Sequence, residues 1–350
     1  MYKISLITGD GVGPELADSA ITILNTISEY TDTGFAVDVL AAGDKVLHDT
    51  GEALPTDTIR SIKESDACLK APVGESAADV IVRLRRMLDL YANIRPARAY
   101  PGVPALRDDV DMVIVRENTE DLYIGEEFLI DDAALALRVI SRYASCRIAH
   151  KAFEMARQRN MMKKVTCVHK SNVMRKSDGL FSEIAGEVAI KYPDVILEQM
   201  YVDACAMNLI RQPEQFDVIL TTNMFGDILS DESSQVVGGL GVAPAANIGD
   251  DFALFEPVHG AAFDIAGRDM VNPISFILSI HMMLEWLGIT KTDDACISMA
   301  GILQTAVSDT MKKGIGTVDI GGTYGTRRLT DHIACTFKDY YDTTDGSDMQ

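Results

Sequence analysis

The chain has 350 residues, and its composition is that of a folded protein with a large excess of acidic side chains. Hydrophobic residues make up 47% and charged residues 24%, which excludes a disordered chain and, at this length, favours two domains or one large α/β unit. The formal net charge of −20 argues against nucleic acid or an anionic membrane as a partner, because both would repel the surface.

The cysteines and the first residues favour a reducing, cytoplasmic compartment. The six cysteines show no C-x-x-C spacing, so neither a zinc site nor a disulfide framework is indicated. The opening run MYKISLITGD lacks the basic region, long apolar core and small-residue cleavage site of a signal peptide. No uninterrupted apolar run is long enough to span a membrane. We therefore expect a cytoplasmic protein with no membrane partner.

Short β-branched runs alternate with longer amphipathic stretches along the chain. Strands are predicted at 3–7, 35–40, 67–71, 112–115, 164–168 and 217–220, and helices at 14–29, near 56–64 and at 76–89. This alternation indicates an α/β architecture with much parallel sheet. Because no linker interrupts the pattern, a second domain must share the sheet or be inserted within the first.

The glycine-rich turn TGDGVGPE at 8–15 follows a predicted strand and precedes a predicted helix, as a dinucleotide-binding turn would. The third position of that fingerprint is Pro14, where glycine or alanine is required, so a standard Rossmann fold is not predicted. Pro14 suits the first turn of a helix instead. We predict a tight strand-to-helix turn near a site.

Three arginines can bind an anionic ligand despite the negative net charge. Arg85 lies in an amphipathic stretch, Arg95 in YANIRP, and Arg116 at the end of the apolar strand MVIV. An arginine at the end of a buried strand needs an anionic partner, and guanidinium groups bind carboxylates through two parallel hydrogen bonds. A purely structural role is the alternative for each of them.

Two aspartates, Asp227 and Asp231, lie four residues apart in TNMFGDILSD, so on a helix that Asp227 opens both carboxylates face the same side. They repel each other unless a cation lies between them, and a hard divalent ion, Mg²⁺ or Mn²⁺, is the natural candidate. Asp203 in YVDACAMN is a third candidate ligand. The alternative is a solvated helix N-terminus, where the helix dipole favours acidic side chains.

Two further residues are candidates for proton transfer. Lys170 ends the run VTCVHK, at the end of a strand where sites in α/β proteins usually open. A nearby metal ion disfavours its ammonium form, which makes it a candidate base. Tyr123 can donate a phenolic proton, so it is a candidate acid.

A second glycine-rich element, EPVHGAAFDIAGRDMVNP, covers 256–273. Its small residues allow the backbone to approach a ligand, and Asp264 could accept a hydrogen bond from a ribose 2′-hydroxyl. A carboxylate there would repel a 2′-phosphate, which favours NAD over NADP. An ordinary loop followed by a capped helix is the alternative, and we interpret His259 as structural or as a cofactor contact.

Together these motifs resemble a known enzyme family. GDGVGPE, LDLYANIRP, RENTEDLY, HKSNV, GDILSD and GGLGVAPAANIGD are similar, in the same order, to motifs of the β-decarboxylating dehydrogenases, which act on isopropylmalate, isocitrate or homoisocitrate. The resemblance implies an α/β fold of the isopropylmalate dehydrogenase type, with two domains that share a large mixed sheet. It implies a large cofactor-binding domain at 1–98 and 247–350, and a small domain at 99–246 with the dimer interface and the metal carboxylates.

The resemblance also implies roles for the candidate residues. Arg85, Arg95 and Arg116 would bind the malate core of a 2-hydroxy dicarboxylic acid. Asp227 and Asp231, with the partner subunit's Asp203, would hold Mg²⁺ or Mn²⁺. The partner subunit's Lys170 would take the hydroxyl proton as hydride moves to NAD, and Tyr123 would protonate the enolate that remains after carbon dioxide leaves. The implied cofactor-binding residues are His259, Gly260, Ala261, Ala262, Asp264, Ile265 and Asn272. The active site would be shared within a homodimer, with a tetramer left open.

The substituent on carbon 3 distinguishes the substrates of this family, and the chain places Ile81 and Val82 one turn before Arg85. Two branched apolar side chains suit an isopropyl group and offer nothing to a third carboxylate. We therefore predict oxidative decarboxylation of (2R,3S)-3-isopropylmalate to 4-methyl-2-oxopentanoate with NAD, as in leucine biosynthesis, with 3-methylmalate as a further candidate substrate. An isocitrate or homoisocitrate dehydrogenase is the alternative, and a non-catalytic regulatory subunit is the alternative from another class.

Overall fold

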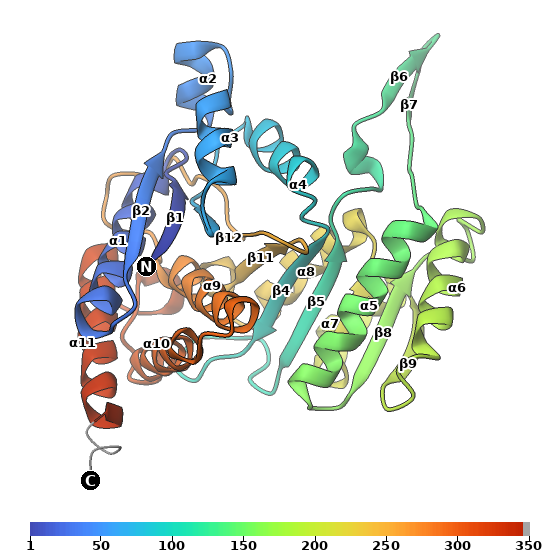
Figure 1. The fold of residues 1–350 in the computed structure, drawn as a ribbon. Helices are drawn as coiled ribbons and strands as arrows, with labels where there is room; N and C mark the ends of the chain where they lie inside the picture. The colour runs from blue at the N-terminus through green and yellow to red at the C-terminus, as the bar shows by residue number, and fades with distance from the viewer. Residues whose placement is uncertain (346–350) are drawn as a thin grey trace.

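A computed structural model describes residues 1–345 and contains a ten-stranded mixed sheet with helices on both faces (Figure 1). The strand order is β2-β1-β3-β12-β11-β4-β5-β10-β8-β9. The strands are β1 (Tyr2–Ile7), β2 (Phe35–Leu40), β3 (Ala67–Lys70), β4 (Ala92–Arg98), β5 (Asp111–Glu117), β8 (Lys164–His169), β9 (Ile196–Tyr201), β10 (Val218–Thr221), β11 (Pro244–Ile248) and β12 (Ala253–Pro257). Residues 346–350 of the predicted large domain lie outside the described part of the chain.

The sheet is parallel in its outer parts and antiparallel at its centre. Strands β2, β1, β3 and β12 pair in parallel, as do β5, β10, β8 and β9. Between these two groups, β12, β11, β4 and β5 pair antiparallel. The prediction of a large mixed sheet that is not a standard Rossmann fold is confirmed. The helix–strand alternation did not predict the antiparallel centre, because β11 and β12 form a hairpin without a helix between them.

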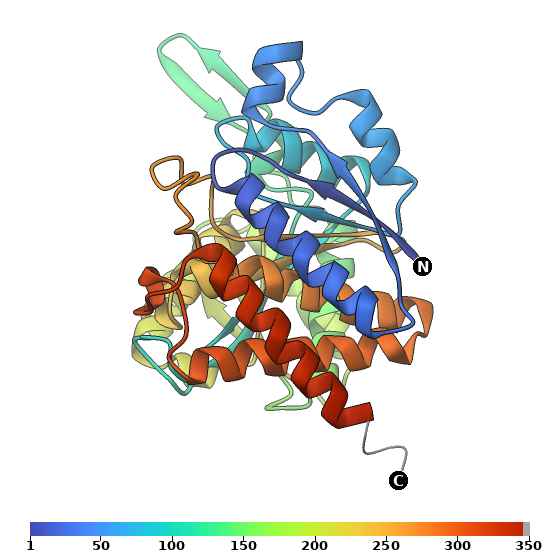
Figure 2. The ribbon, with the colours of Figure 1, turned by 90° about the vertical axis from the view of Figure 1, so that its left-hand side faces the viewer.

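Helices cover both faces of the sheet. In one half they are α1 (Gly13–Tyr30), α2 (Asp44–Thr50), α3 (Thr56–Lys63), α4 (Arg83–Met87), α9 (Ile274–Lys291), α10 (Asp294–Lys312) and α11 (Thr326–Asp345). In the other half they are α5 (Arg142–Arg159), α6 (Ser177–Ala189), α7 (Val202–Arg211) and α8 (Asn223–Val236). Helix α1 packs along α11, as Figure 2 shows, while α5 packs on α6 and α7 packs on α8.

A two-stranded arm extends from the second half of the molecule (Figure 1). It consists of β6 (Glu127–Ile130) and β7 (Ala133–Ala136), which pair only with each other. All of their residues are exposed. The sequence pattern did not predict this arm.

The glycine-rich turn after β1 forms as predicted, and α1 begins at Gly13 with Pro14 in its first turn. Gly9 and Gly11 both have positive φ, of 63° and 57°. A Cβ on Gly11 would lie 2.0 Å from the carbonyl oxygen of Ala261, so only glycine allows this turn to approach the loop after β12.

The helix predicted at 76–89 is shorter and less regular than expected. It begins as a π-helical turn at Ala78–Val82 and continues as α4. The turn points Ile81 into the core between the sheet and α3, whereas Val82 is half-buried. A π-helical turn inside a helix frequently marks a functional site.

One described helix, Ile274–Lys291, is long and apolar enough by length and composition to cross a membrane, with a mean hydropathy of 1.2. However, 61% of this stretch is buried inside the structure. It packs against β11, β12 and α10, so it is the central helix of the core.

Candidate active site

The three predicted arginines converge where α4, β4 and β5 meet α8. Arg85, Arg95 and Arg116 are only 5%, 8% and 1% exposed. Cations this deeply buried require anionic or hydrogen-bonding partners. Their contacts therefore define what the site can bind.

Arg116 and Arg95 both contact the first of the paired aspartates. Arg116 Nη1 lies 2.5 Å from Asp227 Oδ1, and its Nε and Nη2 donate to Asn223 Oδ1 at 3.0 and 2.7 Å. Arg95 Nη2 lies 3.4 Å from the same Asp227 oxygen, and its Nη1 lies 3.3 Å from Asp231 Oδ1. Helix α8 thus places both carboxylates on one face, as predicted, although it begins at Asn223 and not at Asp227.

The charges in this cluster shift the pKa values of their neighbours in opposite directions. Burial opposes ionisation of Asp227, but Arg116 and then Arg95 outweigh it and hold its pKa below the usual value. Burial raises the pKa of Asp231, with Arg95 offsetting part of the effect. Burial, followed by repulsion from Arg95 and Arg85, lowers the pKa of Arg116 to about 9. The crowded guanidinium groups would be stabilised by a further anion.

Arg85 belongs to a buried network that sequence reasoning missed. Its Nη2 lies 3.3 Å from Glu256 Oε1, and Lys70 Nζ lies 2.8 Å from Glu256 Oε2. Burial opposes ionisation of Glu256, but Lys70 and then Arg85 dominate and lower its pKa to about 2. The position of Lys70 at the end of β3, which parallels that of Lys170 after β8, is the signal that could have revealed this network.

Tyr123 lies on a short 3₁₀ turn, Leu122–Ile124, that follows β5. Its hydroxyl donates a short hydrogen bond to Asp227 Oδ2, and the Arg116 guanidinium lies 5.1 Å from the centre of its ring. Burial, and then the hydrogen bond to Asp227, raises the pKa of Tyr123. The phenol therefore keeps its proton at neutral pH and can act as a proton donor.

An open cleft of about 1010 Å³ lies beside Tyr123. Val82 lines this cleft together with Asp79 and Met87, whereas Ile81 does not line it. Of the predicted apolar pair, the structure thus places only Val82 at the cleft wall.

Lys170 and Asp203 form a separate pair. Lys170 follows β8, Asp203 lies in the first turn of α7, and Nζ lies 2.5 Å from Oδ1. The hydrogen bond from Lys170 lowers the pKa of Asp203. Among residues 1–345, no three His, Cys, Asp or Glu side chains gather closely enough to hold a metal ion. One chain therefore does not bring Asp203 to the Asp227–Asp231 pair.

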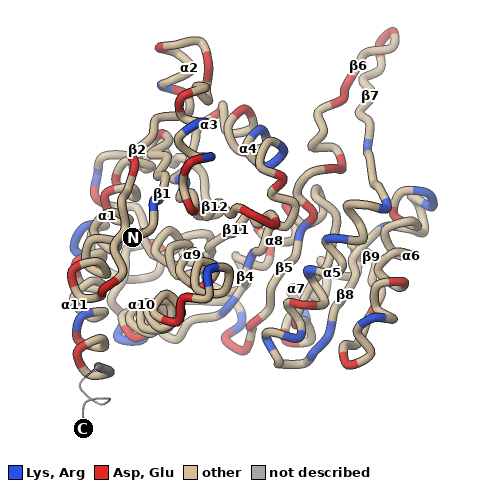
Figure 3. The backbone as a smooth tube through the Cα atoms, viewed as in Figure 1, with Lys and Arg blue, Asp and Glu red and all other residues tan. Residues whose placement is uncertain are grey.

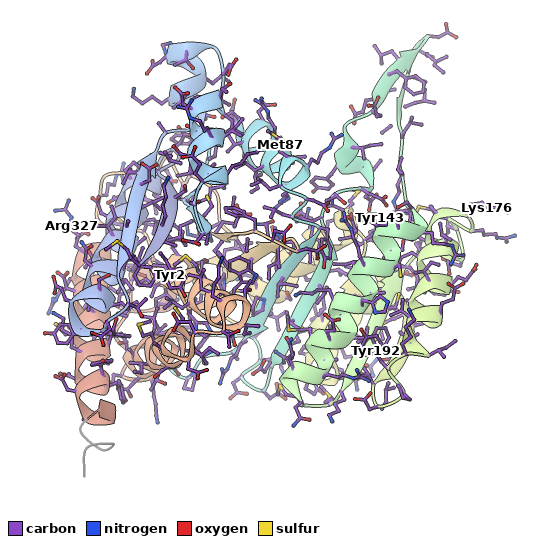
Figure 4. The ribbon with its side chains drawn as sticks, in the orientation of Figure 1. Tyr2, Met87, Tyr143, Lys176, Tyr192 and Arg327 are labelled. Atoms are coloured by element: carbon purple, nitrogen blue, oxygen red, sulfur yellow. The ribbon has the colours of Figure 1, made fainter. Side chains whose placement is uncertain are left out.

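The polar segment after Lys170 faces solvent. Arg175 and Lys176 are exposed, and Figure 4 shows the Lys176 side chain directed away from the molecule. These cations therefore do not contribute to the arginine cluster.

The predicted cofactor loop follows β12 and packs on the glycine-rich turn, where Val12 N donates to Ala261 O at 2.8 Å. The side chain of Asn272 makes structural hydrogen bonds: its Oδ1 accepts from Ile274 N and its Nδ2 donates to Asp319. His259 Nε2 is buried without a hydrogen-bond partner, and burial lowers the pKa of this imidazole. A neutral histidine with an unused nitrogen, five residues before the exposed Asp264 in the same loop, fits a polar ligand such as a nucleotide. Gly260, Ala262 and Ile265 lie in the same loop.

The fold has a well-matched counterpart among solved structures. The crystal structure of isocitrate dehydrogenase from Methylococcus capsulatus superimposes with a TM-score of 0.89 at 40% identity, covering 96% of this chain and 99% of that one. The fold is thus that of an α/β dehydrogenase. The chain belongs to the isocitrate/isopropylmalate dehydrogenase family, whose model matches residues 3–333. This family consists of metal- and NAD-dependent dehydrogenases.

Curated relatives cover nearly the whole chain. The 3-isopropylmalate dehydrogenase of Sulfurisphaera tokodaii is 49% identical over 334 residues, which is 95% of this chain and 98% of the relative. That of Methanothermobacter thermautotrophicus is 48% identical over 337 residues, 96% of this chain and 99% of the relative. A homoisocitrate dehydrogenase of Methanocaldococcus jannaschii is 45% identical over 351 residues, 95% of this chain and 97% of the relative.

Proposed function

We propose that the protein catalyses the oxidative decarboxylation of 3-isopropylmalate with NAD in the cytoplasm, as a step of leucine biosynthesis. The observation that carries the proposal is the cluster of three buried arginines around the Asp227–Asp231 pair, beside a cleft lined by Val82. The isopropylmalate relatives at 48–49% identity support it. A relative named 3-isopropylmalate/3-methylmalate dehydrogenase, 47% identical over 338 residues, makes 3-methylmalate a further candidate substrate.

The arginines would hold the two carboxylates shared by all substrates of this kind. Arg116 and Arg95 are already oriented by Asn223 and Ser230, so they can receive a carboxylate with little rearrangement. Asp227 and Asp231 offer the oxygen ligands that Mg²⁺ or Mn²⁺ prefers, and the bound ion would stabilise negative charge on the substrate oxygen. The protonated phenol of Tyr123 would supply the proton that the product carbon requires.

We further propose that the active site is shared within a homodimer, with the partner subunit's Lys170 as base and the partner subunit's Asp203 as the third metal ligand. The separation of the Lys170–Asp203 pair from Asp227 within one chain supports this proposal. Exposed apolar side chains on α7, α8 and the arm also support it, since such surfaces mark interfaces. They are Met207, Ile210, Met224, Ile228, Phe128, Leu129, Ile130 and Leu135.

The same reasoning extends to the domain division. We propose a large domain at 1–98 and 247–350 and a small domain at 99–246, which divides the sheet between β4 and β5, with the second cut inside β11. The strands that pair on the far side of β4 all come from 111–221, which supports the division.

The wall of the cleft supports an apolar group on carbon 3. Val82 contributes branched carbon atoms, and a third carboxylate would also meet the like charge of Asp79. The guanidinium groups of Arg83 and Arg86 in the same wall are directed to backbone carbonyl oxygens, of Leu54 and Ile124. For the cofactor, we propose NAD over NADP because Asp264 would repel a 2′-phosphate.

The test is reduction of NAD, with NADP in parallel, in the presence of Mn²⁺ and each of four acids: 3-isopropylmalate, 3-methylmalate, isocitrate and homoisocitrate. We expect kcat/KM for 3-isopropylmalate to exceed that for isocitrate by about a hundredfold, the effect of one unsatisfied polar group. Faster oxidation of isocitrate or homoisocitrate at low substrate concentration would refute the substrate assignment and leave the family assignment intact.

A further inference from the structure

Arg138 follows the arm strand β7 and lies between two wholly buried carboxylates, those of Asp121 and Asp178. Its Nε and Nη2 donate to the two oxygens of Asp121 at 2.6 and 3.2 Å, and its Nη1 donates to Asp178 Oδ1. Its Nη2 also donates to Thr222 Oγ1 at 2.9 Å. The guanidinium lies 5.1 Å from the centre of the Phe225 ring, and the side chain is only 14% exposed.

The remaining bonds of the two carboxylates hold the segments that carry the proposed chemistry. Asp121 Oδ1 accepts from Leu122 N at 2.9 Å, directly before Tyr123, and its Oδ2 accepts from Met224 N at 3.1 Å in the first turn of α8. Asp178 Oδ2 accepts from Lys170 N at 2.5 Å. One guanidinium group therefore connects the segments of the acid, the base and the metal-binding helix.

We propose that Arg138 is a positioning residue that fixes Tyr123 and Lys170 relative to helix α8, a proposal that rests on the function proposed above. Without its charge, two buried carboxylates would remain unpaired, and the segments that they hold would shift. Among the described residues, Arg138 shares no hydrogen-bond partner with Arg85, Arg95 or Arg116. Binding of the malate core should therefore survive its replacement.

In the proposed dimer, Tyr123 and Lys170 of one chain serve two different active sites. A single Arg138 would then position the acid of one site and the base of the other. Because displacement of a catalytic group by about 1 Å can reduce the rate about a hundredfold, the main effect should fall on kcat.

The test compares Arg138→Gln and Arg138→Lys with wild type in the full-length protein, using 3-isopropylmalate, NAD and Mn²⁺. We expect kcat to fall about a hundredfold for Gln and about tenfold for Lys, whose ammonium keeps the charge but cannot bridge both carboxylates, while KM changes less than about twofold. Arg142→Gln is the control, because the ion pairs of Arg142 within the described part of the chain, with Glu183 and Glu187, are exposed. It should leave both constants unchanged.

Thermal unfolding and sedimentation of each variant distinguish positioning from a general structural role. A wild-type kcat for Arg138→Lys would overturn the proposal. So would kcat and KM that change together in proportion to the loss of thermal stability. If Arg138→Gln does not fold, the kinetics of Arg138→Lys test the proposal. If neither variant folds, Arg138 is required for folding and the proposal is wrong. Failure of the proposed function is seen separately as a wild-type enzyme inactive on 3-isopropylmalate. The kcat and KM comparison then uses whichever acid of the panel reacts.

Discussion

The Asp227 carboxylate is the meeting point of three groups of the proposed active site, since Arg116, Arg95 and Tyr123 all contact it. The local part of this arrangement could be predicted from the sequence, because spacing of four residues places Asp227 and Asp231 on one helix face. The pairing of Lys70 with Glu256 could not, because these residues are 186 positions apart and meet only through the sheet.

Replacement of Asp227 by Asn should abolish turnover while NAD binding remains nearly normal. The change removes a proposed metal ligand and the anion shared by Arg116 and Arg95, and the metal would act mainly on charge that develops in the transition state. Steady-state kinetics and NAD titration by protein fluorescence would measure the two effects. The control is Asp251→Asn, which removes one exposed negative charge from the β11–β12 turn. Near-normal activity of Asp227→Asn at saturating Mn²⁺ would contradict the metal assignment.

Glu256 should make stability depend on pH in the acid range. Its pKa in the folded protein is about 2, below the ordinary 4.5, so the unfolded chain binds the proton more readily between these values. The stabilisation by Glu256 is therefore complete above about pH 4.5 and is lost as the pH falls towards 2. At neutral pH, Glu256→Gln should lower the free energy of unfolding by about 3 kcal/mol, because Lys70 and Arg85 lose their anion. Denaturant unfolding at several pH values should show this difference shrinking with acid, and a constant difference would contradict the assignment.

At the scale of elements, the strands rich in apolar and β-branched residues were predictable, as β1, β5 and β8 show. Strand β4 was not predicted, because its residues include Asn93, Arg95 and Pro96, which are not typical of a central strand. These polar groups are tolerated there by tertiary contacts, since Asn93 donates to Asn247 and accepts from Arg95. The proposed substrate-binding residue Arg95 and its polar neighbours thus made β4 harder to recognise as a strand.

The π-helical turn before α4 gives the adjacent side chains of Ile81 and Val82 different environments, so their replacement should have different effects. Val82→Arg should narrow or invert the preference for 3-isopropylmalate over isocitrate, because Val82 lines the cleft and the new cation would pair with a third carboxylate. Ile81→Val is the matched control: it should cost about 1 kcal/mol of stability and leave the preference unchanged, because Ile81 lies in the core. The ratio of kcat/KM for the two acids measures the substrate preference of each variant. An unchanged ratio in Val82→Arg would exclude Val82 from the substrate pocket.

At the scale of the whole molecule, acidic and basic side chains are distributed differently. Acidic residues are distributed over both halves of the backbone (Figure 3), which fits the net charge of −20. Arg85, Arg95 and Arg116 are instead buried together, so the site that would receive an anion is shielded from much of the surrounding negative surface. The composition predicts a negatively charged surface. It does not predict that the three arginines lie together, because they meet only when α4, β4 and β5 pack against one another.

The separation of the Lys170–Asp203 pair from Asp227 in one chain, together with the proposed homodimer, predicts that two inactive variants restore activity in each other. In the proposed homodimer, Lys170→Ala and Tyr123→Phe would each damage both active sites. After unfolding and refolding together in equal amounts, half of the dimers would be hybrids with one intact site and one doubly damaged site. Random assortment in a twofold dimer thus predicts about a quarter of the wild-type activity. A mixture no more active than its components would show that each chain works alone.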